Sequence, residues 1–256
     1  MAELQALIFD VDGTLADTER DGHRVAFNQA FAEAGLDWSW SVARYGELLR
    51  VTGGKERIRQ YLSEDHPEIL EEPEIDARIR ELHASKTRHY VALLETGSIP
   101  LRPGVRRLLD EAEAEGLRLA IATTTTPENV TALLEATLGR EGPYRFEVIS
   151  AGDVVPAKKP APDIFIHALE VMNLPAEACL ALEDSDNGVR AARGAGLEVV
   201  VTTNDYTRDQ DFVGALAVLD GLGEQDQPAT VLAGPELRGP AVDVATLRAW
   251  FAGGRG

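Results

Sequence analysis

Four groups of polar side chains in this sequence have the types and order needed to transfer a phosphoryl group. In chain order they are Asp10 with Asp12, the four threonines Thr123–Thr126, Lys158 with Lys159, and Glu183 with Asp184. Carboxylates, hydroxyls and an ammonium are the groups that position a phosphate and neutralise its charge while a nucleophile attacks phosphorus.

The first acidic pair has the spacing of a cation site. In an extended segment Asp10 and Asp12 project to the same side. Neighbouring carboxylates repel each other unless a cation lies between them. Magnesium prefers oxygen ligands and keeps several waters, so two carboxylates and a main-chain carbonyl can hold it and still admit a phosphate. We expect Mg²⁺ as the cofactor, with one carboxylate attacking phosphorus and another moving the proton of the leaving oxygen.

An ammonium and a hydroxyl are expected to complete the site. Lys159 can hold both the nucleophile and the phosphoryl oxygens, and Lys158 is the alternative. A threonine can donate to the same oxygens, and its register within Thr123–Thr126 is left open by the sequence. Glu183 and Asp184 offer further oxygen ligands for the metal.

Predicted strands precede most of these groups. They are Leu4–Phe9, Leu117–Ala122, Phe146–Ile149, Ala178–Leu182, Leu197–Val201 and Leu216–Leu219. Helical patterns alternate with them at Val105–Ala112, Pro127–Leu138, Pro162–Met172 and Asn187–Ala195. This alternation predicts an α/β fold with a doubly wound parallel sheet, in which sites form at the carboxyl ends of the strands.

The segment between the first two strands has a different pattern. Helices are predicted near Val25–Ala34, Ser41–Arg50, Gly54–Leu62 and Ile75–Leu94, with no convincing strand, and Thr96–Pro103 reads as a linker. We therefore predict an α/β core domain of residues 1–15 and 98–256, and an inserted helical cap domain of residues 16–97. A weak amphipathic helix is predicted within Val242–Ala252.

Composition limits the partners. The 256 residues carry a formal charge of −18, which argues against nucleic acid as a partner because no basic stripe is available. An anionic substrate must then be attracted by local cations and a metal, not by the overall field. The first residues lack a basic region, and their apolar run is too short for a membrane span. We expect a cytoplasmic protein with no membrane partner, as a monomer or weak homo-oligomer.

With its four motifs in order, the sequence resembles the haloacid dehalogenase superfamily of phosphohydrolases. The motifs are DVDGT, the threonine closing LAIAT, the lysine of KPAPDIF and the acidic pair of LALEDSDNGV. The resemblance covers nearly the whole chain and implies a Rossmann-like core with a cap. It implies that Asp10 is the nucleophile and Asp12 the general acid and base. It further implies that Thr123 donates a hydrogen bond to the phosphate and that Lys159 is the lysine that holds the nucleophile and the phosphoryl oxygens. It also implies that Asp184 binds the metal with Asp10, with the carbonyl of Asp12 and with support from Glu183.

The cap segment and the threonine run are most similar to the CbbY-like group, which is related to β-phosphoglucomutase. The similarity rests on DTERDGHR, TGGKERI and TTTTPENV. It implies hydrolysis of a sugar phosphate, in particular of xylulose 1,5-bisphosphate, an inhibitory side product of carbon fixation, to xylulose 5-phosphate. The candidate substrate-binding residues are Glu19, His23, Tyr45, Gly53, Gly54, Lys55, Arg57, Thr123, Thr124 and Lys159, and Arg20 and Arg44 could also face the core.

A bisphosphate needs a second anion pocket away from the metal. Gly53, Gly54 and Lys55 could provide backbone donors and a cation at the start of a helix, although an exposed helix start would have the same sequence. His23 could contact substrate or lie on a helix surface. Three alternatives remain open: a phosphomutase of the β-phosphoglucomutase type, a phosphoglycolate phosphatase, and a sugar-phosphate sensor without turnover.

Overall fold

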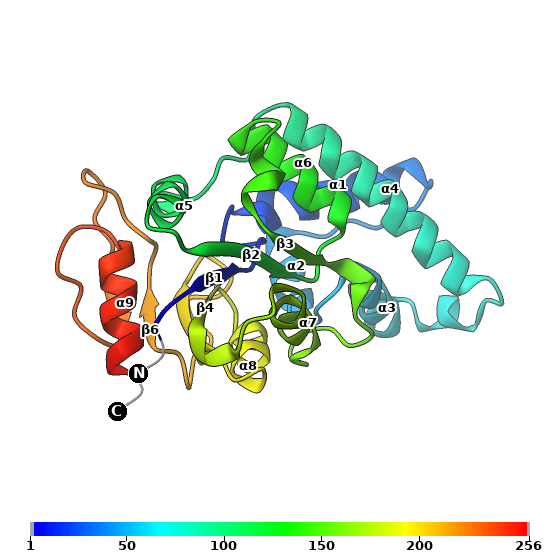
Figure 1. The fold of residues 1–256 in the computed structure, drawn as a ribbon. Helices are drawn as coiled ribbons and strands as arrows, with labels where there is room; N and C mark the ends of the chain where they lie inside the picture. Colours follow the sequence, from blue (N-terminus) through cyan, green and yellow to red (C-terminus); the bar gives the residue numbers. More distant parts are fainter. Residues whose placement is uncertain (1–2, 255–256) are drawn as a thin grey trace.

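The computed structural model describes residues 3–254, in which seven strands form one sheet (Figure 1). The order is β3-β2-β1-β4-β5-β6-β7. The first six strands in the chain pair in parallel, and β7 is antiparallel to β6. The bounds are β1 Ala6–Phe9, β2 Arg118–Thr123, β3 Val148–Ala151, β4 Cys179–Glu183, β5 Glu198–Thr202, β6 Ala217–Leu219 and β7 Val231–Ala233.

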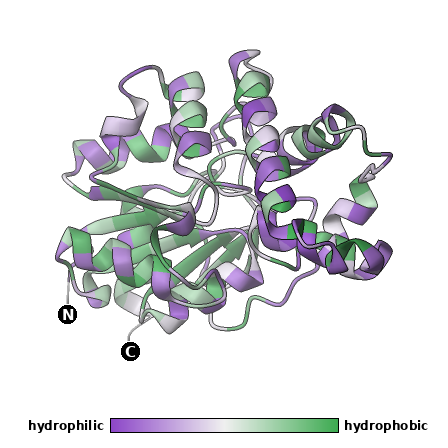
Figure 2. Ribbon diagram, turned by 90° about the vertical axis from the view of Figure 1, so that its right-hand side faces the viewer, coloured by the Kyte–Doolittle hydropathy of each residue, from purple (hydrophilic) through white to green (hydrophobic). Residues whose placement is uncertain are grey.

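Helices cover both faces of the sheet. Successive side chains of β1 point to opposite faces, and all of them are apolar, so each face needs a cover. Leu7 and Phe9 pack into one hydrophobic core with α5 (Val105–Ala114), α6 (Pro127–Leu138) and α9 (Val244–Gly253). Ala6 and Ile8 pack into a second core with α7 (Asp163–Met172) and α8 (Asp186–Gly194). In Figure 2 the strands are coloured mostly as hydrophobic, whereas the helices alternate between hydrophobic and hydrophilic. The predicted doubly wound α/β fold is confirmed.

The helices between β1 and α5 form a unit with its own aromatic core, which we call the cap. Its elements are a π-helical turn η1 (Glu19–His23), α1 (Arg24–Glu33), α2 (Val42–Leu48), α3 (Gly54–Asp65), a 3-10 turn η2 (Pro67–Glu71) and α4 (Ile75–Glu95). Trp40 is fully buried at its centre, with ring centroids 4.7 Å from Phe27 and 4.9 Å from Phe31. The division of the chain at residues 16–97 remains our proposal.

The two connections between cap and core lie side by side. Ala16, on the outgoing connection, forms an antiparallel bridge with Leu101 on the returning one. The N–H of Arg102 donates to the carbonyl of Leu15 at 2.9 Å. The cap is therefore attached to the core through a pair of hydrogen-bonded segments that begins next to Asp12.

Two features of the sheet differ from the predictions. The strand expected at Phe146–Ile149 lies at Val148–Ala151, because residues 142–145 form a 3-10 turn and Phe146 packs against Phe9 at 6.4 Å between ring centroids. The edge strand β7 was not predicted. Its Leu232 is 54% exposed, so the segment lacks the pattern of a buried strand.

The cap core predicts a large effect of truncating Trp40. Trp40→Ala should lower the free energy of unfolding by about 3–5 kcal/mol, because it leaves a cavity among the surrounding rings. Tyr144→Ala is the control, since Tyr144 is 81% exposed and its removal should change stability by less than about 0.5 kcal/mol. Chemical denaturation, monitored by the far-ultraviolet circular dichroism of the backbone, measures both free energies of unfolding. Equal effects would show that Trp40 does not support the cap.

Candidate active site

A cavity of about 650 Å³ lies where the carboxyl ends of the strands face the cap. The core contributes Asp10, Asp12, Thr123, Thr124, Lys159 and Asp184, and the cap contributes Glu19, Gly46, Arg50, Thr52 and Arg57, among others. This is the edge at which the sequence predicts a site, because parallel strands bring their carboxyl ends together.

Asp10 lies on the floor of this cavity, directly after β1. Its N–H donates to the carbonyl of Leu182 at 2.9 Å and so continues the pairing of β1 with β4. Its side chain is only 9% exposed. The carboxylate is therefore held by the central strands of the sheet rather than by a mobile loop.

Lys159 is buried between two carboxylates. Its Nζ donates to Asp10 Oδ1 at 2.7 Å and to Glu183 Oε1 at 2.5 Å. Burial lowers the pKa of Lys159, but the charges of Asp10 and Glu183 outweigh this and raise the pKa above its usual value. Lys158 turns away and donates to the carbonyl of Gly152 and to Asp153. The geometry thus favours Lys159, as the sequence analysis did.

Asp10, Glu183 and Asp184 place carboxylate oxygens within 4.8 Å of one another. The pKa of Asp10 is raised to about 8. Burial is the largest cause of this rise, Lys159 opposes it, and the charges of Glu183 and Asp12 add to it. Burial, Asp10 and Glu183 also raise the pKa of Asp184 well above its usual value. One lysine does not balance three buried carboxylates, so a hard divalent cation suits this donor set. The residues present therefore fit Mg²⁺.

The Asp12 carboxylate is not part of this cluster and is held by the cap connection. Its Oδ1 accepts from Thr18 at 2.5 Å and lies 2.8 Å from Nε2 of His23. Burial raises the pKa of Asp12, but the charge and hydrogen bond of His23 and the hydrogen bond of Thr18 lower it below its usual value. His23 is 3% exposed and does not line the cavity, so neither the surface position nor the direct substrate contact considered from the sequence describes it.

The threonine run divides into two pairs with different surroundings. Thr123 closes β2 and is buried, and both Thr123 and Thr124 line the cavity. Thr125 Oγ1 accepts from Asn129 at 3.0 Å, and Thr126 caps the N-terminus of α6. This geometry restricts the candidates for a phosphate donor to Thr123 and Thr124.

Three cap residues form a buried polar chain above the cavity. Tyr45 donates to Glu19 and accepts from Arg57 Nη1 at 2.8 Å. Burial raises the pKa of Tyr45 well above its usual value, so the phenol stays protonated. Glu19 and Arg57 line the cavity, whereas Tyr45 is fully buried behind them and does not. Tyr45 therefore positions the two charged groups.

The three residues predicted to form a second anion pocket, Gly53, Gly54 and Lys55, lie outside this cavity. The ammonium of Lys55 pairs with Asp153 at 2.5 Å, and the carboxylate of Glu56 lies against Gly53. A carboxylate at this helix start disfavours an anion, so here the expectation from sequence is corrected. Arg50 and Arg57 are the cap cations that do line the cavity.

Two other arginines of the cap also lie outside the cavity. Arg44 pairs with Glu47, Glu64 and Asp65 at the surface of the cap. Arg20 pairs with Asp205 of the core at 3.8 Å and so faces the core, as expected. Neither is among the residues that line the cavity.

Comparison with known proteins agrees with this geometry. Residues 4–196 match the haloacid dehalogenase-like hydrolase family. The CbbY protein of Cupriavidus necator is 49% identical over 253 residues, covering 98% of each chain. The chain belongs to the haloacid dehalogenase-like hydrolases. Within that family it belongs to the CbbY group and is an enzyme, a phosphatase.

Solved structures of a CbbY protein have the same fold. The crystal structure of CbbY from Rhodobacter sphaeroides with phosphate has a TM-score of 0.79 and 48% identity, covering 85% of this chain and 94% of that one. A structure of its D10N variant with xylulose 1,5-bisphosphate has a TM-score of 0.78 with the same coverage and identity.

Several residues that bear on the site were missed from the sequence. Asn204 follows β5 and donates to Asp184 Oδ2 at 2.7 Å. Asn187 of α8 donates to Thr52 at 3.1 Å, which joins core and cap at the cavity. The rule that sites form at strand ends points to Asn204. The contact between Asn187 and Thr52 depends on how the cap packs and has no sequence signal.

Lys86 is a buried cation of α4 that the sequence analysis passed over. It is 3% exposed, and its Nζ lies 5.3 Å and 5.2 Å from the ring centroids of Phe27 and Tyr90. The pKa of Lys86 is lowered to about 8, mainly by burial, and the charges of Asp12 and Glu19 oppose this lowering. Lys86 therefore adds positive charge on the cap side of the catalytic carboxylates.

None of the helices in the described part of the chain combines the length and the hydrophobicity needed to cross a bilayer.

The two adjacent lysines provide a matched test of the site. Lys159→Met should reduce phosphatase activity on a generic phosphate ester, p-nitrophenyl phosphate, by at least about 100-fold, because a buried charge-assisted donor is lost. Lys158→Met should retain activity within about threefold, since its partners lie outside the cavity. Circular dichroism checks that both variants fold. The reverse order of effects would assign the catalytic lysine to Lys158.

Proposed function

We propose that this chain is a Mg²⁺-dependent sugar-phosphate phosphatase whose substrate is xylulose 1,5-bisphosphate and whose product is xylulose 5-phosphate. The observation that carries the proposal is the buried group of Asp10, Lys159, Glu183 and Asp184 beneath a cavity with cationic cap residues. The similarity to a CbbY protein whose D10N variant was crystallised with xylulose 1,5-bisphosphate supports the choice of substrate.

The first step is attack of an Asp10 oxygen on the 1-phosphate. Asp10 and Asp184, supported by Glu183 and by the carbonyl of Asp12, would hold Mg²⁺, which neutralises the phosphate and the nucleophile. Lys159 holds the attacking carboxylate and donates to the phosphoryl oxygens, and Thr123 or Thr124 donates to the same oxygens. The bond from phosphorus to the sugar oxygen breaks as the Asp10–phosphorus bond forms.

Asp12 moves the proton in both steps. Its contacts with Thr18 and His23 both use Oδ1, so Oδ2 is left for the reacting oxygen. In the first step Asp12 gives a proton to the departing sugar oxygen, so its carboxyl must be protonated when the substrate is bound, against the lowering of its pKa by His23 and Thr18. In the second step it takes a proton from the water that attacks the phospho-aspartate and frees Asp10. The fixed orientation of Asp12 is therefore supplied by the connection to the cap.

The second phosphate of a bisphosphate is assigned to the cap arginines. Arg57 is 7% exposed, lines the cavity and uses Nη1 for Tyr45. Nη1 is taken by Tyr45 and Nε is buried, so Nη2 is the donor that we assign to the ligand. Arg50 lines the same cavity. The phosphate that is kept would thus bind at a distance from the metal, which distinguishes the two ends of the sugar.

Turnover of xylulose 1,5-bisphosphate tests the whole proposal. With Mg²⁺ the protein should release one phosphate per sugar and leave xylulose 5-phosphate, whereas EDTA should stop the reaction and added Mg²⁺ should restore it. Asp10→Asn should lower the rate by at least about 1,000-fold, because the nucleophile is lost, while calorimetry still detects the bisphosphate.

Phosphate release, product identification by mass spectrometry and calorimetry measure these outcomes. Transfer of phosphate to a second sugar hydroxyl would favour the phosphomutase alternative. Preferred release from phosphoglycolate would favour that ester as substrate. Binding without turnover would identify a sensor. A cytoplasmic location and a monomeric or weakly oligomeric state also remain predictions.

Arg57 and Arg59, both on α3, test the second-phosphate site with matched substitutions. Arg57→Gln should raise KM for the 1,5-bisphosphate by about tenfold or more, because a charge-assisted contact is lost. KM for xylulose 1-phosphate should change much less. Arg59→Gln should leave both values within about twofold, since Arg59 pairs with Asp76 away from the cavity. Steady-state kinetics decide; an equal rise for both substrates would remove the assignment.

A further inference from the structure

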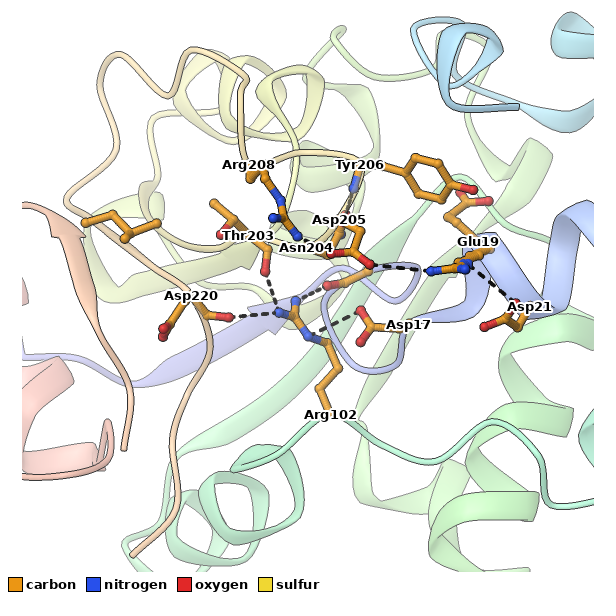
Figure 3. A pocket seen from close by; sticks show the side chains of 13 residues that line it. Asp17, Glu19, Asp21, Arg102, Thr203, Asn204, Asp205, Tyr206, Arg208 and Asp220 are labelled. Atoms are coloured by element: carbon orange, nitrogen blue, oxygen red, sulfur yellow. Dashed lines mark hydrogen bonds and ion pairs between the residues drawn. The ribbon is translucent and has the colours of Figure 1, made fainter. Parts of the chain in front are cut away.

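Arg102 is a buried arginine beside the active site that neither the motifs nor the proposed mechanism uses. It lies on the returning connection from the cap, and its side chain is 8% exposed. Arg102 lines a second cavity of about 550 Å³. Figure 3 shows its guanidinium among the other side chains that line this cavity. This cavity adjoins the substrate cavity, and the two share Glu19, Asn204 and Tyr206 in their linings.

The guanidinium joins three parts of the chain through main-chain carbonyls. Nη1 donates to the carbonyl of Gly13, in the turn after Asp12, and to the carbonyl of Thr202 at 3.0 Å. Nη2 donates to the carbonyl of Thr203 at 2.5 Å and to that of Asp220 at 3.3 Å. A planar fork of donors can satisfy several carbonyls at once, which a lysine cannot do in the same geometry.

These contacts are on both sides of the metal ligand Asp184. Gly13 has a φ of +88°, and a Cβ on it would lie 2.2 Å from Asp184 Oδ2 and 2.6 Å from Asn204 Nδ2. Asn204 itself donates to the same carboxylate oxygen at 2.7 Å. The backbone of Gly13 and the amide of Asn204 thus enclose Asp184. Arg102 binds the carbonyl of Gly13 and the carbonyl of Thr203, the residue before Asn204.

The outgoing connection orients Arg102 in turn. Nε of Arg102 lies 3.4 Å from Asp17 Oδ1, and this pair is drawn in Figure 3. Asp17 follows the bridge between Ala16 and Leu101. Both connections to the cap therefore contribute to the arrangement that encloses Asp184.

We propose that Arg102 is a positioning residue that sets the place of Asp184 relative to Asp10, and thereby the affinity of the site for Mg²⁺. It acts through the turn at Gly13 and through Asn204, and it touches neither the metal ligands nor the substrate. The inference rests on the proposed Mg²⁺ site but not on the identity of the sugar. A purely stabilising role for Arg102 predicts a lower Tm with unchanged affinity for Mg²⁺.

Magnesium binding to the full chain separates them, with Arg107 as the matched control. Arg107 is another arginine that donates to two carbonyls, those of Leu222 at 3.3 Å and Gly223 at 3.1 Å, and it does not line the substrate cavity. Mg²⁺ is titrated without substrate, and the rise in Tm gives the half-saturating concentration. Arg102→Lys should raise that concentration about tenfold, as for other residues that orient metal ligands. Arg107→Lys should lower Tm but leave the concentration unchanged.

Asn204→Ala keeps the measurement decisive if Arg102→Lys does not fold. It leaves the carbonyl contacts of Arg102 intact and removes only the bond to Asp184, so it should also weaken Mg²⁺ binding about tenfold. In the double variant the two effects should not add, because both act through one connection.

Parental Mg²⁺ affinity in either Arg102→Lys or Asn204→Ala would overturn the inference, as would additive losses. Absence of Mg²⁺ binding to the parent protein would instead refute the metal site of the proposed function. The two failures are therefore distinguishable.

Discussion

The balance of charge among buried carboxylates is the constraint on which this structure depends. Asp10, Glu183 and Asp184 share one small region, and Lys159 supplies the ammonium that bonds to the first two. Buried charges are costly unless they are paired and hydrogen-bonded, and one lysine leaves an excess of negative charge here. A hard cation is the simplest compensation, and an anionic substrate can approach only once that compensation is present. The proposed metal site and the proposed phosphate site would thus both follow from one electrostatic requirement.

The rest of the fold serves to keep these groups in place. Parallel pairing of β1 with β4 fixes Asp10 beside Glu183, and the packing of α7 behind the sheet brings Lys159 between them. The cap adds the groups that the core lacks. Thr18 and His23 orient Asp12, and Arg57 with Tyr45 and Glu19 forms a second polar region over the cavity. Because the protein has a formal charge of −18 and acidic side chains also line the cavity, an anion must be attracted locally, by Lys159, by Arg50 and Arg57 and by the proposed metal.

The connections between cap and core have a larger role than linkers usually have. Asp12, Thr18 and His23 lie within one short stretch that leaves the core, and Arg102 lies on the stretch that returns to it. These segments bond to each other and to the turn at Gly13. In the proposed metal site, the position of the cap and the geometry of the metal ligands would therefore be linked. In the proposed function, substrate binding by the cap and catalysis in the core would share a common support.

The sequence alone determined the fold class, the strand ends that form the site and the order of its chemical groups. This was readable because parallel strands place their carboxyl ends at one edge, so residues far apart in the chain can be assigned to one site without coordinates. Only the tertiary structure decided which of several candidate residues, close together in the sequence, faces the cavity. Thr125 and Thr126 serve α6, His23 is buried behind Asp12, and Arg57 rather than Lys55 faces the cavity. Such choices depend on the path of the backbone and on how the cap packs over the core, and residue type and spacing do not encode them locally.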